Sequence, residues 1–285
     1  MAGDRLNLEQ TRRPPSFMTC LDGRDMSHAA LFGSCPHTPR KVVAPLLLLL
    51  MQVMQACNGS NSSGKELGGV ANEDFSYERV RMVEIQIAGR GIRDDRVLEA
   101  MRRVLRHRFA PELDPARVYE DRPQPIGHGQ TISQPYIVAL MSEAARLEPP
   151  CKVLEVGTGS GYQAAVLAEM GCTVYSIEII EALAQQSREI LEAEGYGERV
   201  VVRAGDGYHG WPDQAPFDAV IVTAAAPRLP SSLLEQLKVG GRLVIPVGDV
   251  WQVLEVHRRT AEGYERSQLS GVRFVPMTGE IRRRR

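Results

Sequence analysis

The sequence is poor in the features that mark metal-binding, disulfide-rich and membrane-spanning proteins. It contains only five cysteines, no CxxC pair and no HExxH motif, so we expect no metal site. The five are Cys20, Cys35, Cys57, Cys151 and Cys172. Cys151 and Cys172 each stand at the start of an apolar segment, where cysteine is usually a small buried residue. We therefore expect no disulfide framework and a reducing compartment.

The sequence also lacks an excess of charge of either sign. Its 34 Lys and Arg residues are balanced by 35 Asp and Glu, so a general attraction to nucleic acid is not expected. The one basic run is Arg282–Arg285, and we expect residues 281–285 to form a solvated basic tail. A length of 285 residues allows one sizeable core with an appendage, and we expect the protein to act as a monomer.

Residues 1–76 differ in composition from the rest of the chain. Up to Arg40 they are rich in Pro, Arg, Ser and Gly, and they show no helix or strand periodicity. The apolar run Val42–Met54 is too short for a comfortable membrane span, so we expect no integral span. Asn58–Gly64 has the composition of a flexible linker. We expect residues 1–76 to be a disordered extension.

One segment of this extension resembles an export signal. Arg40 and Lys41 precede the apolar run and Ala56 precedes Cys57, which resembles a bacterial lipoprotein signal. Met54–Ala56 match poorly the residues that usually precede a lipidated cysteine, and the apolar run begins farther from the N-terminus than in a typical signal. Arg12-Arg13 is too distant from this run for a twin-arginine signal. A misplaced start codon or a dispensable extension is the alternative. We expect a cytoplasmic protein, with export or lipid anchoring through Cys57 as the second possibility.

Regular structure is predicted from about Tyr77. Val80, Val83 and Ile87 indicate a first helix that is broken at Gly89–Gly91. Asp94 or Asp95 can cap a second helix, whose apolar face is Val97, Leu98, Met101, Val104 and Leu105. After the proline-containing loop Pro111–Gln130, a third helix runs from about Gln134 to Leu147 with Ser133 as its N-cap.

Short apolar strands then alternate with helices. The predicted strands are Lys152–Val156, Thr173–Glu178, Arg199–Ala204, Phe217–Val222 and Arg242–Pro246, and the helices are Tyr162–Met170, Glu181–Glu194 and Ser231–Leu237. This pattern predicts an α/β fold with a doubly wound, mostly parallel Rossmann-like sheet. Val253–Arg258 and Gln268–Val275 flank a turn at Glu262-Gly263 and predict an antiparallel C-terminal hairpin. The predicted domain covers residues 77–280.

A glycine-rich turn follows the first of these strands. Gly157, Gly159 and Gly161 occupy the strand-to-helix connection, where glycine permits a tight turn and a close approach by a ligand. Glu178 ends the next strand, where a carboxylate commonly binds ribose hydroxyls, and Asp206 follows the third strand. All of these positions lie at carboxyl ends of parallel strands, where open α/β sheets bind ligands.

The turn could bind either of two classes of nucleotide cofactor, a nicotinamide dinucleotide or S-adenosylmethionine. A nicotinamide dinucleotide site has the spacing G-x-G-x-x-G, whereas the spacing here is G-x-G-x-G. Glu155, two residues before the first glycine, would oppose a pyrophosphate but suits the cationic sulfonium and amino group of S-adenosylmethionine. The motif therefore favours a methyltransferase over an oxidoreductase.

Several segments outside this turn share one further pattern. They are Arg90–Ile92, Pro125–Tyr136, Glu155–Gln163, Gly205–Tyr208, Phe217-Asp218, Val222–Pro227, Gly240–Val244 and Val272–Pro276. Together they resemble the protein-L-isoaspartate O-methyltransferases of the bacterial type over roughly the last 205 residues. The sequence departs from the family at Leu105, where a proline is common, and in residues 1–76, which the resemblance does not cover.

The resemblance implies an enzyme that uses S-adenosylmethionine. Its substrate would be the α-carboxylate of L-isoaspartyl residues in damaged proteins, and methylation would start repair through a succinimide. Ser133 corresponds to the catalytic position. The implied cofactor contacts are Glu155, Gly157, Thr158, Gly159, Glu178, Asp206 and Gly207, and the expected substrate contacts are Ile126, Gly127, His128 and Thr131.

Structural roles compete with these functional ones. Ser133 could be a plain N-cap, although we hypothesise that its hydroxyl and the free N–H groups of the helix start present the substrate carboxylate. Thr131 is a second hydroxyl candidate. His128 need not act as a base because a carboxylate is already ionised at neutral pH, so we expect it to shape the peptide groove. A nicotinamide-dependent oxidoreductase and a non-catalytic nucleotide- or peptide-binding module remain as alternatives.

Overall fold

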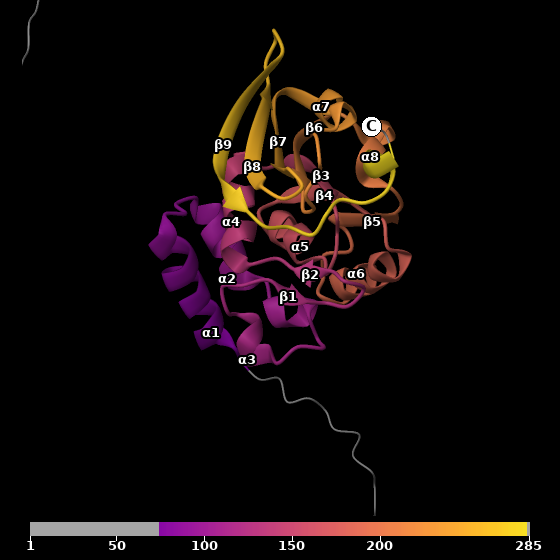
Figure 1. The fold of residues 1–285 in the computed structure, drawn as a ribbon. Coiled ribbons are helices and arrows are strands. Elements are labelled where there is room, and N and C mark those ends of the chain that lie inside the picture. The colour runs from indigo at the N-terminus through magenta and orange to yellow at the C-terminus, as the bar shows by residue number, and fades with distance from the viewer. Residues whose placement is uncertain (1–73, 284–285) are drawn as a thin grey trace, which may run out of the picture. The chain divides into compact units, whose positions relative to one another are not determined.

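The computed structural model describes residues 74–283 (Figure 1). They belong to one unit of dense internal contacts, Gly68–Arg285, which is distinct from Met1–Leu67. The predictions made for the apolar run Val42–Met54, for the linker after it and for Cys57 lie outside the described residues. The same is true of the last two arginines.

A seven-stranded sheet forms the centre of the fold. Its spatial order is β5-β4-β3-β6-β7-β8-β9. The strands are β3 (Cys151–Val156), β4 (Cys172–Glu178), β5 (Val200–Ala204), β6 (Phe217–Val222), β7 (Leu237–Val247), β8 (Gln252–Arg259) and β9 (Tyr264–Val272). β3 to β7 pair in parallel, and β8 and β9 add an antiparallel ribbon at one edge that extends beyond the other strands in Figure 1. This confirms the predicted doubly wound sheet with its antiparallel hairpin.

Helices cover both faces of the sheet. They are α2 (Asp95–Arg103), α4 (Pro135–Ala145), α5 (Tyr162–Glu169), α6 (Glu181–Ala193) and α7 (Ser231–Glu235). One hydrophobic cluster joins α2, α4, α5 and α6 to the sheet, and a second joins α7 to its other face. Because both faces are covered, the central strands are apolar almost throughout, as in β6, where only Asp218 is not fully buried.

The N-terminal helices follow the predicted pattern. α1 (Ser76–Arg81) continues into a π-helical turn at Met82–Ile87 and a 3₁₀ turn at Ala88–Arg90. The helix then stops at Gly91, whose φ of 104° is left-handed. Asp94 caps α2, since its side chain accepts a hydrogen bond from the backbone N–H of Arg96. The predicted break and the predicted capping site are both confirmed.

The start of α4 differs from the prediction. Ser133 is not the N-cap, because Gln134 occupies that position and Pro135 is the first helical residue. Proline is favoured there since its missing N–H would be unpaired in any case. The predicted loop Pro111–Gln130 contains two short elements, α3 (Pro115–Val118) and β1 (Gln124–Pro125). The strand β2 (Thr131–Ile132) follows the loop and pairs with β1 in antiparallel fashion.

The strand β7 is longer than predicted. It begins at Leu237, which the sequence pattern assigned to the preceding helix, and it passes through Gly240 and Gly241. A register shift against β6 accommodates this stretch between Phe217 and Ala219. Glycine weakens the apolar pattern of a strand, although it is common at such irregularities. The strand was therefore predicted to begin only at Arg242.

Two cysteines form a disulfide, so the expectation that Cys151 and Cys172 are separate buried thiols is wrong. They are the first residues of β3 and β4 and lie directly opposite each other in the parallel ladder, with Cα atoms 4.4 Å apart. That separation allows the two side chains to bond. The sequence could not show it, because the pairing depends on the register of the two strands.

The described part of the predicted basic tail packs on the domain. Glu280–Arg283 form the short helix α8, and Ile281 is buried in the second hydrophobic cluster. The Arg282 guanidinium donates to Asp249 Oδ1 at 2.5 Å and to the Met277 carbonyl oxygen at 3.0 Å. Ile281 and Arg282 are therefore held on the domain and are not part of a free tail, whereas Arg283 is exposed as the sequence predicted.

Within residues 74–283, no helix has the length and apolar character that crossing a bilayer would require.

Reduction of the Cys151–Cys172 bond should destabilise the domain. The bond closes a loop with a sequence separation of 21, and chain-entropy arguments put the contribution of such a loop at about 3 kcal/mol. We expect urea unfolding of the reduced protein to show a lower free energy of unfolding than that of the oxidised protein. The double variant Cys151→Ala, Cys172→Ala should be insensitive to reductant. Alkylation of both thiols without prior reduction would contradict the assignment.

Candidate active site

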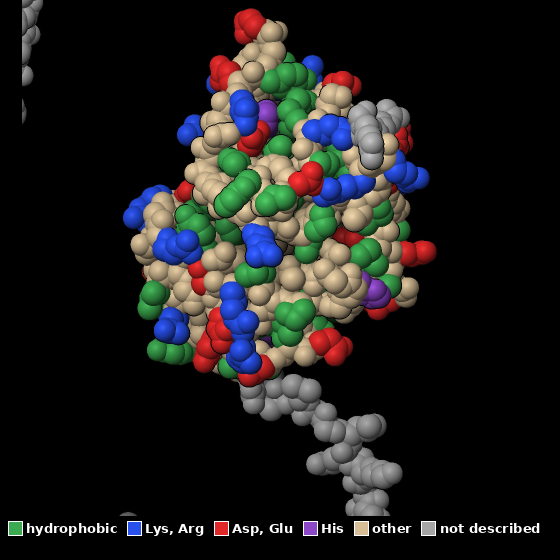
Figure 2. All heavy atoms as spheres, viewed as in Figure 1, with side chains coloured by type: hydrophobic (Ala, Val, Ile, Leu, Met, Phe, Trp, Pro, Cys, Tyr) green, Lys and Arg blue, Asp and Glu red, His purple; other side chains and the backbone are tan. Residues whose placement is uncertain are grey.

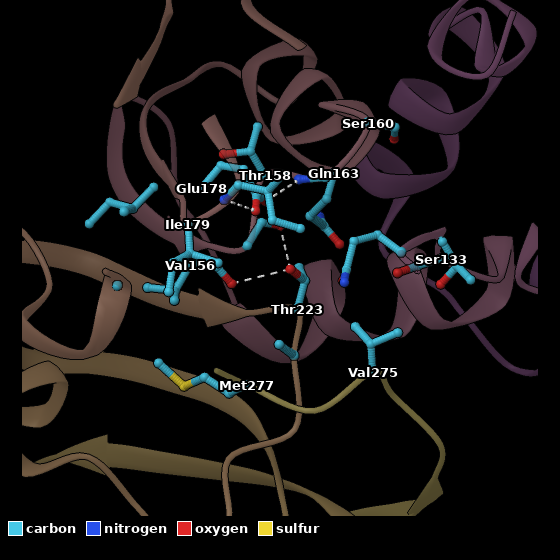
Figure 3. A pocket seen from close by; sticks show the side chains of 18 of the residues that line it. Ser133, Val156, Thr158, Ser160, Gln163, Glu178, Ile179, Thr223, Val275 and Met277 are labelled. Carbon is cyan, nitrogen blue, oxygen red and sulfur yellow. Dashed lines mark hydrogen bonds between the residues drawn. The ribbon is translucent and has the colours of Figure 1, made fainter. Parts of the chain in front are cut away.

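A cavity lies at the carboxyl ends of β3, β4 and β6, next to the point where the strand order reverses (Figure 3). Open α/β sheets bind their ligands at this position. The space, including its open side, is about 830 Å³, which is within the range of small-molecule sites. Of the residues predicted from sequence, Thr131, Ser133, Gly157, Thr158, Gly159, Glu178, Asp206 and Gly207 all line it.

The first glycine of the turn is required by a close contact. Gly157 has a φ of 100°, and a Cβ added there would lie 2.4 Å from Thr223 Oγ1. The Thr223 hydroxyl donates to the carbonyl oxygens of Val156 and Gly157, so it holds the end of β3 against the end of β6. Figure 3 shows Thr223 in this position at the floor of the cavity. Thr223 was not among the site residues predicted from the sequence.

The N–H groups of the glycine turn are used within the protein. The Gly157 amide donates to the Ile177 carbonyl oxygen at 2.8 Å, and the Gly161 amide donates to the Thr158 carbonyl oxygen at 2.8 Å. The Gly159 amide donates to Glu178 Oε2 at 2.9 Å. A pyrophosphate-binding turn must instead offer such amides to its anion. The three glycine amides of the turn are therefore already paired within the protein, which disfavours a pyrophosphate there.

Two carboxylates are fixed in the cavity wall. Glu178 Oε1 accepts from the Ile180 amide at 3.0 Å while Oε2 holds Gly159. Asp206 accepts from the amides of Tyr208 and Glu280, at 2.9 and 2.7 Å. Each oxygen keeps a second lone pair, so both carboxylates can also accept from hydroxyl or amino groups of a ligand.

Glu155 lies behind the turn and not on the cavity wall. Its side chain is fully buried, Oε2 accepts from the Ser176 hydroxyl at 2.5 Å, and Oε1 has no hydrogen-bond partner. The Ser176 hydroxyl also contacts Thr158 Oγ1, which lines the cavity, at 2.5 Å. Burial raises the pKa of Glu155 to about 8, and the nearby charge of Glu178 adds to the rise. Glu155 reaches the cavity only through this hydroxyl chain.

The Ser133 hydroxyl is free to bind a ligand. It makes no hydrogen bond to any residue in the described part of the chain, and it lies at the opposite end of the cavity from Glu178 (Figure 3). The Ser133 carbonyl oxygen accepts from Arg106 Nη2 at 2.8 Å. Ser133 therefore has a fixed backbone and an unoccupied hydroxyl, which is the opposite of what an N-cap would show.

Arg106 is a site residue that the sequence analysis missed. It is fully buried, it donates from Nε to the Val118 carbonyl oxygen at 2.8 Å, and its guanidinium lies 4.8 Å from the centre of the Tyr162 ring. Burial lowers its pKa. A buried arginine is rare unless it has partners, and here the partners are two backbone carbonyls of the segments that lead to the site. Arg106 thus fixes the Ser133 backbone.

Asp121 supplies the side-chain acceptor that Ser133 was expected to supply at the helix start. Its carboxylate accepts from the Tyr136 amide at 3.1 Å and from Gln134 Nε2 at 2.8 Å. Arg90 pairs with Asp121 at 2.5 Å and stacks on the Tyr136 ring at 3.6 Å. The N-terminus of α4 already binds a carboxylate of the protein, so the hypothesis that it presents the substrate carboxylate is not supported.

Of the other predicted substrate residues, some lie at the cavity or the glycine turn and some do not. Thr131 lines the cavity, and Ile126 lies against the glycine turn, 3.7 Å from where a Gly159 Cβ would be. Gly127 and His128 form the tip of the β1–β2 turn, where His128 is exposed with a φ of 51°. Neither of these two is among the residues that line the cavity.

Gln163 is another residue that sequence reasoning missed. Its side-chain amide donates to Ser142 Oγ at 2.9 Å, while its buried Oε1 has no partner and the residue lines the cavity. Together with Glu178 and Asp206 it offers acceptors to a ligand. The residues that line the cavity include no Lys, Arg or His. The electrostatic environment therefore favours a ligand that carries positive charge and hydrogen-bond donors.

A family model described as protein-L-isoaspartate(D-aspartate) O-methyltransferase matches residues 78–282. The chain belongs to this family. The matched segment begins in α1 and ends in α8, so the family resemblance extends over the complete sheet and over both walls of the cavity.

Curated relatives of this family are similar over nearly their whole length. The chain is 56% identical over 201 residues to a protein-L-isoaspartate O-methyltransferase of Gloeobacter violaceus, covering 70% of this chain and 98% of that protein. It is 57% identical over 219 residues to one of Opitutus terrae, with coverages of 74% and 94%. The alignments therefore cover nearly all of both relatives.

Solved structures of the family share the fold. One protein-L-isoaspartate O-methyltransferase superposes with a TM-score of 0.66 at 28% identity, covering 71% of this chain and 67% of the other. A Plasmodium falciparum protein of the same description, in complex with S-adenosyl-L-homocysteine, superposes with a TM-score of 0.62 at 28% identity and coverages of 70% and 98%.

The buried Glu155 should make stability depend on pH. Between about pH 4.5 and about pH 8 the unfolded chain has lost the Glu155 proton while the folded protein keeps it, so the free energy of unfolding should fall as pH rises. Glu155→Gln should remove this fall and become more stable relative to the wild type at the upper end of the range. Urea unfolding at a series of pH values measures the difference.

The control for loss of a carboxylate is Glu192→Gln, on the exposed face of α6. A Glu155→Gln curve parallel to that of the wild type throughout this range would show that Glu155 is not held protonated by the fold.

Proposed function

We propose that this protein transfers the methyl group of S-adenosylmethionine to the α-carboxylate of L-isoaspartyl residues in damaged proteins, which starts repair through a succinimide. The observation that supports this most is the cavity of a family member in which a free Ser133 hydroxyl faces fixed carboxylates and no cationic side chain. That arrangement suits a cationic cofactor on one side and a carboxylate substrate on the other.

The cavity fits the cofactor chemically. Glu178 and Asp206 are acceptors fixed by backbone amides, and the unpaired Gln163 Oε1 supplies a third. These three are the residues that would hold the hydroxyl and amino groups of the cofactor. Gly157, Thr158, Gly159 and Gly207 would bring the backbone close to it. Glu155, which the fold keeps protonated, would support the Thr158 hydroxyl from behind the turn through Ser176.

The reaction requires no acid–base catalysis by the protein. When bound, S-adenosylmethionine would supply a methyl group carried on a positively charged sulfur; the carboxylate oxygen would form the new bond to this methyl group, and sulfur would keep the electron pair of the broken sulfur–carbon bond. A carboxylate is already ionised at neutral pH, and no base is needed. The task of the protein is to hold the carboxylate in line and to exclude water.

Ser133 is suited to hold the carboxylate. Its hydroxyl is free to donate, and its backbone is fixed by Arg106 from one side and by the start of α4, which Asp121 anchors, from the other. Thr131 is a second hydroxyl on the same wall. We assign the orientation of the carboxylate to Ser133, with Thr131 as a further donor, and we assign no proton transfer to His128.

The apolar part of the wall assists the reaction. Val138, Val156, Ile177 and Met277 line the cavity and are buried. Opposite charges on the two reactants diminish as the methyl group moves, so a site with little water favours the transition state.

We propose two alternative cellular locations, and a different observation supports each. A cytoplasmic location follows from the cofactor, which is a cytoplasmic metabolite. Export or lipid anchoring through Cys57 is favoured by the Cys151–Cys172 disulfide, since such bonds persist mainly in oxidising compartments. Detection of lipid on Cys57 distinguishes the two. We propose a monomer in either case.

Replacement of Ser133 by alanine should slow methyl transfer. We expect the wild type to methylate an isoaspartyl peptide and not the matching aspartyl peptide, measured as transfer of a radioactive methyl group from S-adenosylmethionine. Loss of one hydrogen bond to a charged group should cost Ser133→Ala about tenfold to a hundredfold in kcat/KM.

The matched control is Ser160→Ala, since Ser160 also lines the cavity but its hydroxyl already accepts from the Tyr162 amide. It should retain most of the activity. Unchanged kinetics in Ser133→Ala would remove Ser133 from the reaction. Failure of the wild type to methylate any isoaspartyl peptide, with the fold intact, would overturn the proposed function.

A further inference from the structure

A second and larger groove leads away from the cofactor cavity. The two share Thr131, Ser133, Thr223, Val275 and Pro276 in their walls, so the groove begins where the substrate carboxylate is proposed to bind. An isoaspartyl residue within a polypeptide has chain on both sides, and this chain must leave the site through such an opening.

We propose that the loop between β7 and β8, with Val250 and Trp251 at its tip, is a specificity-determining contact for the polypeptide that flanks the isoaspartyl residue. This inference rests on the proposed function. The occupant is a substrate segment with a large apolar side chain, which packs on Trp251, and with an acidic residue, which pairs with Arg273. Both the loop and Arg273 line the groove.

The tip of the loop exposes an unusual amount of apolar surface. Val250 and Trp251 are 87% and 89% exposed, more than any other large hydrophobic residue in the described part of the chain. Figure 2 shows hydrophobic side chains gathered around the ends of β8 and β9. Tryptophan dominates many recognition surfaces because it offers a large contact area with few rotatable bonds. An exposed Val-Trp pair on the wall of a substrate groove is therefore suited to bind an apolar group of a ligand.

The loop is held in place by the fold. Gly248 has a φ of 127°, and a Cβ there would lie 1.9 Å from the Trp251 carbonyl oxygen, so the turn is tight. Asp249 at the tip pairs with Arg282 of α8 at 2.5 Å. The exposed side chains are thus presented from a fixed backbone, which lowers the entropy cost of binding.

Gln252 ties the loop to the catalytic cavity. Its side-chain amide donates to the Phe274 carbonyl oxygen at 3.1 Å and accepts from the Phe274 amide at 2.6 Å. This pair of bonds fixes the segment that continues to Val275 and Pro276, and those two residues line both the groove and the cofactor cavity. The position of the loop relative to this shared wall is therefore set by the fold, and the loop and Ser133 line the same groove.

The available charge in the groove is positive. Arg90 is paired with Asp121, and Asp249 is paired with Arg282. Arg273 is exposed and makes no hydrogen bond or ion pair with any residue between 74 and 283. An acidic side chain of the substrate would gain a partner there, whereas a basic one would be repelled.

The test compares isoaspartyl peptides that differ only in the residues on both sides of the isoaspartate. One set carries leucine, one glycine and one glutamate. For Trp251→Ala we expect KM for the leucine peptide to rise about tenfold while kcat and the glycine peptide are unchanged, because only an apolar contact is lost. For Arg273→Gln we expect the preference for glutamate over glycine to disappear.

The matched control is Tyr77→Ala, an aromatic residue of α1 that is 73% exposed and does not line the groove. Its kinetics should equal those of the wild type, and thermal unfolding should show that all three variants remain folded.

The outcomes separate this inference from the proposed function. A wild type that methylates none of the peptides defeats the proposed function. A wild type that is active while Trp251→Ala retains the same ratio of KM values for leucine and glycine peptides overturns the inference. If sedimentation shows that Trp251→Ala only dissolves a dimer and the KM ratio is unchanged, the loop contacts a second copy of this chain, which also overturns it.

Discussion

The site depends on the way the glycine turn after β3 is held between two neighbouring strands. Glu178 at the end of β4 binds the Gly159 amide from one side, and Thr223 at the end of β6 binds the carbonyls of Val156 and Gly157 from the other. The bond to Glu178 uses an amide N–H that a phosphate could otherwise bind, and it leaves a carboxylate in the wall. The same constraint explains why Gly157 must be glycine and why the cavity prefers positive charge.

A second set of contacts positions the substrate side of the cavity. Arg106 binds the Ser133 carbonyl and Asp121 binds the Tyr136 amide at the start of α4, so the Ser133 hydroxyl is not needed to hold this segment. On this side of the cavity, structural and chemical roles belong to different residues. Arg106 and Asp121, which do not line the cofactor cavity, hold the chain, and the uncharged Ser133 hydroxyl faces the ligand. Fixed backbone around a free donor is the arrangement expected of a preorganised site.

Much of this could be predicted because it follows from local patterns. Alternating apolar strands and helices gave the correct sheet, since burial on both faces requires them, and the glycine turn with Glu178 and Asp206 was correctly placed at strand ends. The contacts that depend on register or on distant segments could not be predicted. The Cys151–Cys172 bond, the bond from Arg106 to Ser133 and the role of Asp121 at α4 join residues whose proximity no sequence spacing shows. Glu155 was found by its motif, but its burial behind the turn was not.

The central claim is that this cavity selects a cationic sulfonium cofactor and rejects a dinucleotide. Calorimetric titration of the purified protein with S-adenosylhomocysteine, S-adenosylmethionine and NAD tests it most directly. The account predicts saturable binding of the first two ligands and none of NAD. Binding of NAD, with no heat from either adenosyl ligand in a folded protein, would contradict it.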